Sequence, residues 1–315
     1  MESTSPTPTI PGASPTLPTP LTRAGASYAV TTGDLPAHRP LGQFLLLGDS
    51  LTQEAHRQKD GFGMGAELQN AYIRRFDVIN RGFSGYNTDH ILLILQDIIP
   101  TPQQAHIKFL TIWLGANDSN PLGTNPPQHV PLSRFRFNLN DIISNRAVTA
   151  HIPGGLEVVL ITPPPVDEYL LSQNFTGERK EGRSVEGARE YAEAVKEVGS
   201  ITGVPVVDIW TAFMRKIGWE ESSAASIPIP GKSEDGGKAG LGLLLSDGLH
   251  LTPQGYRLVY DELIKVMKER FPMYPPYTMP FSVKVPWEAA RGGGHWDVVV
   301  QKGDVLRGVE EDEVK

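Results

Sequence analysis

The chain has 315 residues, 39% of them hydrophobic, which is enough for one sizeable core or at most two domains. Its formal net charge of −7 gives no electrostatic reason to bind nucleic acid or an anionic membrane surface. The absence of cysteine excludes disulfides, thiolate catalysis and cysteine-bound metal sites. No apolar run is as long as a membrane span and the N-terminus lacks a signal-peptide pattern, so a cytoplasmic protein without a membrane span is expected.

The two ends of the chain differ in composition from its middle. Residues 1–40 begin with a stretch dominated by Ser, Thr and Pro, which has little to bury and is predicted to be disordered. Residues 41–271 carry the hydrophobic pattern of a folded domain. Residues 272–315 contain several prolines, which argue against a long helix, together with Trp287 and Trp296. We expect this C-terminal extension to pack on the domain or on a partner subunit.

Five short apolar runs alternate with helical patterns along residues 41–271. Continuous apolar runs of this length are typical of strands that are buried on both faces of a parallel sheet. Strands with intervening helices predict an α/β fold, specifically a three-layer α/β/α sandwich with a five-stranded parallel sheet. The predicted strands are Gln43–Leu47, Asp77–Asn80, Ile107–Leu114, Glu157–Ile161 and Val204–Ile209.

Two of the intervening segments have apolar residues three to four positions apart, which predicts amphipathic helices. The second helix is expected to begin with Thr252 as its N-cap and Pro253 in its first turn. Residues 220–246, rich in Gly, Ser and charged residues, are predicted to form an exposed loop. The apolar stripes are Ala188, Tyr191, Val195 and Val198 in the first helix, and Tyr256, Val259, Leu263 and Met267 in the second.

Polar and glycine-rich motifs follow the predicted strands, at the edge where parallel α/β sheets gather their functional groups. The first strand runs into GDSL at 48–51, the second into NRGFSG at 80–85 and the third into GAND at 115–118. A fourth motif, SDGLH at 246–250, precedes the last helix. Each motif alone is weak, and the first also fits an ordinary serine at a helix N-cap. Their joint presence in this order is the informative signal.

This ordered set of Ser, Gly, Asn and His blocks resembles the SGNH, or GDSL-type, hydrolase superfamily, whose fold is flavodoxin-like. Over residues 41–270 the chain resembles the isoamyl acetate-hydrolysing esterase branch. The resemblance implies a carboxylic ester hydrolase that acts on small acetate-type esters such as isoamyl acetate, without cofactor or metal, and that forms a homodimer in some relatives. The stretches that carry it are GFGMGAELQNAYIRRFDVINRGFSGYNT at 61–88, WLGANDS at 113–119, HVPLSRFRFNL at 129–139, ITPPPV at 161–166 and SDGLHLTPQGY at 246–256.

The resemblance implies that Ser50 is the nucleophile and that His250 and Asp247 are its acid–base partners. A serine hydroxyl is a poor nucleophile until a base takes its proton, and His250 is the candidate base. Asp247 can reach the other ring nitrogen of His250 only if the D-x-x-H segment turns tightly, which Gly248 makes easy.

The resemblance also implies three donors to the oxyanion that forms on ester attack: the Ser50 N–H, the Gly85 N–H and the Asn117 side-chain amide. Gly82 lies in the same loop as Gly85 and remains an alternative donor. Asp118, beside the amide, is a rival acid for the triad, although its position favours support of the loop.

Two further functions stay open at this point. An acyltransferase could use the same residues and pass the acyl group to an alcohol instead of water. A non-catalytic flavodoxin-like domain could bind an anion or a protein, and this would require Ser50 and His250 to lie apart. The chain has no G-x-S-x-G motif, which argues against the nucleophile elbow of α/β-hydrolases.

Overall fold

The computed structural model describes residues 41–124, 127–175, 182–223 and 228–282, which all belong to one compact unit. The predicted disorder of residues 1–40 lies outside the described residues, as do Trp287 and Trp296 of the predicted extension. None of the described helices has the length and apolarity needed to cross a membrane.

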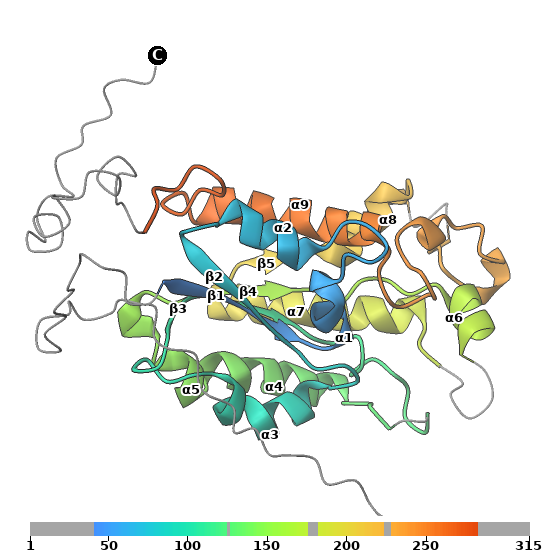
Figure 1. The fold of residues 1–315 in the computed structure, drawn as a ribbon. Coiled ribbons are helices and arrows are strands. Elements are labelled where there is room, and N and C mark those ends of the chain that lie inside the picture. Colours follow the sequence, from blue (N-terminus) through green and yellow to red (C-terminus); the bar gives the residue numbers. More distant parts are fainter. Residues whose placement is uncertain (1–40, 125–126, 176–181, 224–227, 283–315) are drawn as a thin grey trace, which may run out of the picture. The chain divides into compact units, whose positions relative to one another are not determined.

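The centre of the fold is a five-stranded parallel sheet with the order β2-β1-β3-β4-β5, which confirms the predicted α/β architecture (Figure 1). The chain leaves β1 toward β2 on one side and later adds β3 on the other side. In sheets of this order, ligands bind beyond the carboxyl ends of the strands beside that reversal. The strands are β1 (Gly42–Gly48), β2 (Phe76–Gly82), β3 (His106–Trp113), β4 (Glu157–Ile161) and β5 (Val206–Val207).

Four of the predicted strands agree with the structure to within two residues at each end, whereas the fifth prediction was too long. Only Val206–Val207 pairs with β4. The Asp208 side chain accepts a hydrogen bond from Thr211 N at 3.0 Å and caps a helix that begins at Ile209. This cap ends the strand, because the capping residue already accepts the first bonds of the next helix.

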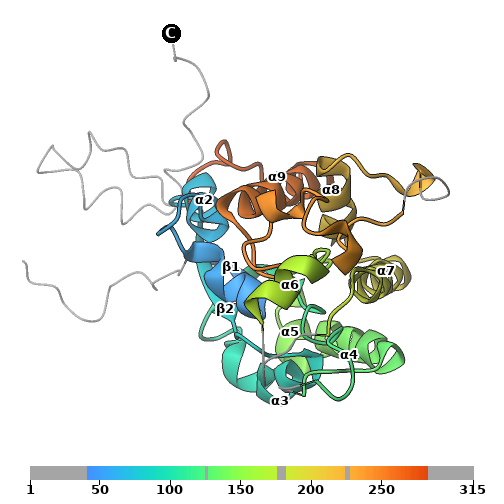
Figure 2. The same ribbon diagram turned by 90° about the vertical axis from the view of Figure 1, so that its right-hand side faces the viewer.

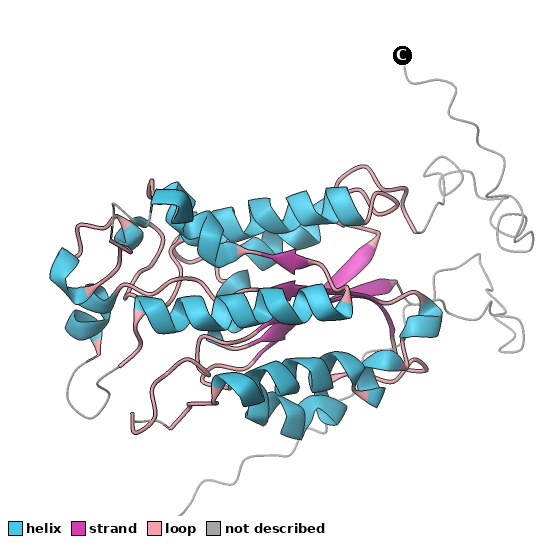
Figure 3. Ribbon diagram, turned by 180° about the vertical axis from the view of Figure 1, so that it is seen from behind, coloured by secondary structure: helices cyan, strands magenta, loops and turns pink. Residues whose placement is uncertain are grey.

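Helices cover both faces of the sheet (Figures 1 and 3). On one face lie α2 (Met64–Ala71), α8 (Ile209–Lys216) and α9 (Pro253–Arg270). On the other lie α3 (Thr88–Ile98), α4 (Leu132–Ser144) and the main apolar stripe of α7 (Val185–Thr202). The shorter helices are α1 (Ser50–Gln53), α5 (Arg146–Thr149), α6 (Glu168–Asn174), and the 3₁₀ turns Glu54–His56, Ile152–Gly154, Glu221–Ser223, Ser233–Asp235 and Leu241–Leu243.

The sequence of β1 is continuously apolar because the strand is buried on both faces. Phe44 and Leu46 belong to the core on the α2 and α9 side, and Leu45 and Leu47 to the core on the α3 and α4 side. Because successive side chains of a strand point to opposite faces, a strand with helices on both faces needs apolar residues at every position.

The two predicted amphipathic helices are confirmed as α7 and α9. All eight residues of the predicted stripes are buried, none exceeding 5% exposure. The start of α9 is also confirmed, since Gly255 N donates to the Thr252 hydroxyl at 3.1 Å and Pro253 is the first helical residue.

The prediction of an exposed loop over residues 220–246 was wrong at its C-terminal end. Leu241, Leu244 and Leu245 are at most 2% exposed. Leu245 forms an antiparallel bridge with Leu251, so this segment is anchored to the start of α9. The composition of the whole stretch concealed a short apolar run that the fold buries.

The first part of the C-terminal extension lies along the connection between α2 and β2. Tyr277 N donates to Ala71 O at 2.7 Å, Ser282 N to Arg74 O at 3.1 Å, and the Arg75 guanidinium to Tyr277 O at 2.6 Å. These hydrogen bonds attach residues 277–282 to the core of the fold on its α2 face.

Candidate active site

The turn between β1 and α1 presents Ser50 at the carboxyl edge of the sheet. Ser50 is the first residue of α1, and Asp49 caps the helix by accepting from Leu51 N at 2.9 Å. A Cβ atom at Gly48 would lie 2.1 Å from the Thr52 hydroxyl and 2.5 Å from Trp113 O. Only glycine fits this close approach, so the GDSL motif reflects packing as well as chemistry.

The D-x-x-H segment makes the tight turn that its glycine predicts. Asp247 Oδ1 accepts from Leu249 N at 2.9 Å and from His250 N at 2.8 Å, which leaves Oδ2 to meet His250 Nδ1 at 2.7 Å. Gly248 has φ +95°, and a Cβ there would lie 2.5 Å from Asp167 O. Both the backbone conformation and the close packing therefore require glycine at this position.

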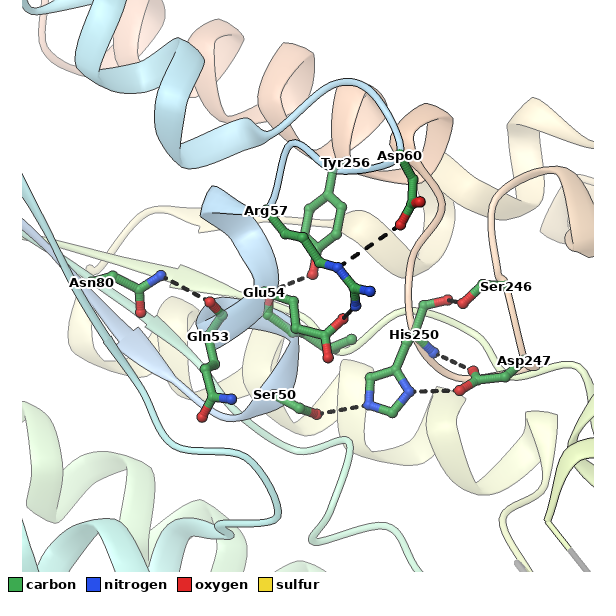
Figure 4. A network of polar contacts seen from close by, with 11 residues as sticks. Ser50, Gln53, Glu54, Arg57, Asp60, Asn80, Ser246, Asp247, His250 and Tyr256 are labelled. Carbon is green, nitrogen blue, oxygen red and sulfur yellow. Dashed lines mark hydrogen bonds and ion pairs between the residues drawn. The ribbon is translucent and has the colours of Figure 1, made fainter.

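The imidazole of His250 reaches the hydroxyl of Ser50 across the top of the sheet (Figure 4). Its Nε2 lies 3.1 Å from Ser50 Oγ, although the two residues are 200 positions apart. Tyr256 of α9 donates its hydroxyl to Leu51 O at 2.8 Å, which ties the helix after His250 to the helix that begins with Ser50. This geometry is inconsistent with the non-catalytic alternative, which required the serine and the histidine to lie apart.

Asp247 and His250 shift each other's pKa in opposite directions. Burial alone would lower the pKa of His250, but the hydrogen bond and charge of Asp247 outweigh it and raise that pKa above its ordinary value. Burial likewise opposes ionisation of Asp247, yet the hydrogen bond from His250 and two backbone N–H groups hold its pKa below the usual range. The two shifts agree in describing a carboxylate that stabilises an imidazolium.

The loop after β2 is attached to α1. Ser84 N donates to Gln53 Oε1 at 2.9 Å. Within β2, the Asn80 amide donates to Thr52 O at 2.7 Å and to Gln53 O at 3.3 Å, and Figure 4 draws the second bond. The sequence prediction did not assign this role to Asn80. The contact fixes the C-terminal end of α1 and so supports the position of Ser50.

Gly82 and Gly85, the two alternative oxyanion donors, lie in different surroundings. A Cβ at Gly82 would lie 2.0 Å from Gln53 N, and Gly82 N already donates to Asn80 Oδ1 at 2.8 Å. Gly82 therefore packs beneath α1. Gly85 has φ +82°, and the atom nearest to a Cβ there is Gln128 Nε2 at 3.5 Å.

Asn117 stands in the loop after β3 and is linked to the loop after β2. Its side-chain Nδ2 donates to Tyr86 O at 2.8 Å, and the residue is 4% exposed. The loops that carry Ser50, Gly85 and Asn117 therefore follow three adjacent strands, β1, β2 and β3, at one edge of the sheet.

A model of the GDSL-like lipase/acylhydrolase family matches residues 46–258, more than half of the chain. The chain belongs to this family. Two curated relatives support the esterase branch. The isoamyl acetate-hydrolyzing esterase of Saccharomyces cerevisiae is 32% identical over 252 residues, covering 77% of this chain and 92% of the relative. A human isoamyl acetate-hydrolyzing esterase 1 homolog is 33% identical over 261 residues, covering 80% and 93%.

A GDSL esterase/lipase of Arabidopsis thaliana is 31% identical over 247 residues, covering 76% of this chain and 90% of its own length. A solved structure from Streptococcus pneumonia, 21% identical, has a TM-score of 0.50 and covers 72% of this chain and 85% of its own; it supports the fold alone. The predicted resemblance is confirmed, and this GDSL-family chain is a serine ester hydrolase.

Two aspartates are buried in the loops that follow β1 and β3 of this GDSL hydrolase. Asp118 Oδ1 accepts from the backbone N–H and the hydroxyl of Thr88, at 2.9 and 2.5 Å, and holds the start of α3. Burial raises the pKa of Asp49 to about 6 and that of Asp118 to about 7. Neither Oδ2 atom has a hydrogen-bond partner within the described part of the chain. The contact with Thr88 fits loop support, whereas His250 Nδ1 is bonded to Asp247.

Arg183 and Gln128 were missed by the sequence analysis. Arg183 is 5% exposed and donates to Asn117 Oδ1 at 3.0 Å and to Gln128 Oε1 at 3.1 Å. Neither residue follows a predicted strand or belongs to one of the family blocks, so no local signal identified them. Over the residues that the structure covers, no group of three or more His, Asp or Glu side chains is arranged to hold a metal ion.

Proposed function

We propose that Ser50, His250 and Asp247 act as a catalytic triad that hydrolyses small acetate-type esters through an acyl-serine intermediate. The observation that carries the proposal is the position of His250, with Nε2 3.1 Å from Ser50 Oγ and Nδ1 2.7 Å from Asp247 Oδ2. In this arrangement the imidazole can take the serine proton while the carboxylate fixes its tautomer and stabilises the charge that forms.

Three donors are proposed to bind the oxyanion: the Ser50 N–H, the Gly85 N–H and the Asn117 amide. The choice of Gly85 over Gly82 is supported by the Gly82 N–H, which already donates to Asn80 Oδ1. Asn117 Nδ2 carries two hydrogens and gives one to Tyr86 O, so the second is available to a substrate oxygen.

The proposed reaction needs no group outside the chain except water. Ser50 Oγ attacks the ester carbonyl as His250 Nε2 takes its proton, and the resulting imidazolium protonates the departing alcohol. A water molecule then loses a proton to His250 and attacks the acyl-serine, which releases the acid and restores the serine.

The proposed substrate class is supported by the relatives. The yeast and human relatives are named for hydrolysis of isoamyl acetate, the acetate ester of a short branched alcohol. We therefore place acetate esters of short alcohols first among the candidates, ahead of long-chain acyl esters.

The decisive test is Ser50→Ala, assayed with p-nitrophenyl acetate and isoamyl acetate. We expect kcat to fall by about 10⁴-fold or more, because the nucleophile is lost while binding remains. A fluorophosphonate should label the unaltered protein and leave the variant unlabelled. Ser144→Ala, on the exposed face of α4, is the matched control and should keep full activity.

Two results would contradict the proposal. Hydrolysis by Ser50→Ala at the unaltered rate would exclude the triad. A rate that rises steadily with acyl chain length would exclude the acetate preference. Measuring how the acyl group divides between water and added isoamyl alcohol in the same assay separates a hydrolase from an acyltransferase.

A further inference from the structure

A buried arginine that the proposed reaction does not use lies beside the proposed oxyanion donors. Arg183 directly precedes Ser184, the N-cap of α7, and is 5% exposed. Its Nε donates to Ala116 O at 2.7 Å, and its Nη2 donates to the side chains of Asn117 and Gln128. A guanidinium is costly to bury unless such contacts satisfy it, so this position requires an explanation.

We propose that Arg183 and Gln128 are positioning residues that together fix two oxyanion donors, the Asn117 amide and the Gly85 N–H. This inference rests on the proposed function, because it assigns the way in which that site is aligned. Neither residue touches the reacting atoms; each acts through the donor that it holds.

The guanidinium determines which way the Asn117 amide points. Asn117 Oδ1 accepts from Arg183 at 3.0 Å, while Nδ2 donates to Tyr86 O at 2.8 Å. A flipped amide would set its N–H groups against the guanidinium and its oxygen against the Tyr86 carbonyl. Both contacts would be repulsive, so the amide is held with its remaining N–H free to meet an oxyanion.

Gln128 carries the same alignment to the loop after β2. Its Oε1 accepts from Arg183 at 3.1 Å and from the Asn120 amide at 3.2 Å, and these two bonds orient Nε2 to donate to Gly85 O at 2.8 Å. The backbone oxygen of Gln128 also accepts from the Asn87 amide at 2.8 Å. Gly85 has φ +82°, a conformation that a flexible glycine loop can leave easily. The bond from Gln128 Nε2 holds Gly85, and the bond from Asn87 fixes the backbone of Gln128.

The charge of Arg183 adds an electrostatic contribution. Burial lowers the pKa of Arg183 to about 10, against the charges of Asp49, Asp247 and Asp118, so it stays protonated at neutral pH. A fixed cation behind the Asn117 amide favours negative charge developing in front of it, and prearranged charge of this kind costs no reorganisation during the reaction.

The test compares an ester with its thionoester, in which sulfur replaces the carbonyl oxygen. Sulfur accepts hydrogen bonds weakly, so the ratio of kcat/KM for p-nitrophenyl acetate to that for its thiono analogue reports on the oxyanion donors. For Arg183→Met we expect kcat for the oxygen ester to fall by about 10²–10³-fold with little change in KM, and the ratio to fall at least about 10-fold.

Gln128→Leu provides a second variant that leaves the bond between Arg183 and Asn117 in place. It should lower kcat and the ratio in the same direction by a smaller factor, and it decides the question if Arg183→Met fails to fold. Arg136→Met is the control, because Arg136 lies on α4 and its hydrogen bonds go to Glu197 and to Leu132 O, outside this network. Stoichiometric fluorophosphonate labelling gives the active fraction of each preparation.

A purely structural role would lower the active fraction or both ester rates equally and leave the ratio unchanged, and that result would overturn the proposal. Ser50→Ala, measured beside these variants, distinguishes failure of the proposed triad from failure of the proposed positioning role. If Ser50→Ala is inactive while the ratio is unchanged in both other variants, the positioning role is wrong and the triad stands. If Ser50→Ala keeps its activity, the proposed function itself is wrong.

Discussion

The two ends of the same sheet are built from opposite kinds of residue. Toward the amino end, the ring of Phe109 stacks on Phe44 at 5.1 Å between centroids and meets Phe76, Phe271 and Tyr274 edge-on at 5.7, 5.3 and 5.2 Å. Aromatic clusters of this kind bury large apolar areas and need few polar partners. This end, which we call the aromatic end, is where the sheet gains stability from packing.

At the carboxyl end, the interior holds charged and polar groups instead. Asp49, Asp118 and Arg183 are at most 5% exposed there, and both aspartates have an oxygen without a hydrogen-bond partner among the described residues. Such burial costs folding free energy. The comparison indicates that packing at the aromatic end offsets the cost of the polar groups that the carboxyl end buries. Figure 2 views the molecule with the carboxyl end of the sheet toward the reader.

The largest expected effect is a loss of activity without a loss of stability, from a substitution at the carboxyl end. Asp247→Asn should lower kcat for p-nitrophenyl acetate by about 10⁴-fold, because an amide neither fixes the productive tautomer of His250 nor stabilises its cation. An asparagine oxygen still accepts from the N–H groups of Leu249 and His250, so the melting temperature should change little. A large loss of stability with intact kcat would contradict the division of roles.

The second effect is its counterpart at the aromatic end. Phe109→Ala should destabilise the fold by about 3–5 kcal/mol, because it removes a fully buried ring from the centre of the cluster. Activity per folded molecule, measured well below the melting temperature, should stay close to the unaltered value. Phe137→Ala, at a position on α4 that is 70% exposed, is the control and should shift stability by at most about 0.5 kcal/mol.

A smaller effect concerns the cost of the buried carboxylates. Burial raises the pKa of Asp118 from 3.8 to about 7, so the folded state holds this proton more tightly than the unfolded state. The contribution of this proton to the free energy of unfolding is fully present below the pKa of the unfolded state. It is lost as the pH rises through the pKa of the folded state. Asp118→Asn removes the titration, and its Oδ1 can still accept from Thr88.

The stability of Asp118→Asn relative to the unaltered protein should therefore increase between pH 4 and pH 7, by about 3 kcal/mol. Denaturant unfolding at several pH values measures it. Asp49, whose pKa burial raises to about 6, titrates in the same range, and its charge also raises the pKa of Asp118, so the difference reports the coupled pair. Parallel stability curves would mean that the buried carboxylate costs nothing.

The strands, the amphipathic helices and the family motifs were predictable because their signals are local. Strand β1 and the buried stripe of α9 can be predicted from the spacing of apolar residues over a short stretch of sequence. The turn at Gly248 follows from the spacing of Asp247 and His250. The short β5 was mispredicted because the apolar run continues into α8, and only the cap at Asp208 separates strand from helix.

The contacts of Arg183 at the carboxyl end could not be predicted in this way. Arg183 contacts Asn117, 66 positions away in the chain, and Gln128, 55 positions away. None of the three lies in a helix or strand whose hydrophobic period would mark its position. Their contacts depend on how the loops after β2 and β3 settle against the start of α7. A buried arginine in a polar segment resembles an exposed one until the tertiary structure is known.

The smallest expected effect concerns the pH dependence of the unaltered enzyme. Although burial alone would lower it, the bond and charge of Asp247 hold the pKa of His250 above 6.5. Because only the neutral imidazole can take the serine proton, kcat/KM should rise with pH and reach half of its plateau above pH 6.5. In Asp247→Asn the remaining activity should reach half of its plateau at a lower pH, since the group that raises the pKa is gone. A midpoint that did not move would mean that Asp247 orients the ring without stabilising its charge, and the carboxyl end would then depend on hydrogen-bond geometry more than on electrostatics.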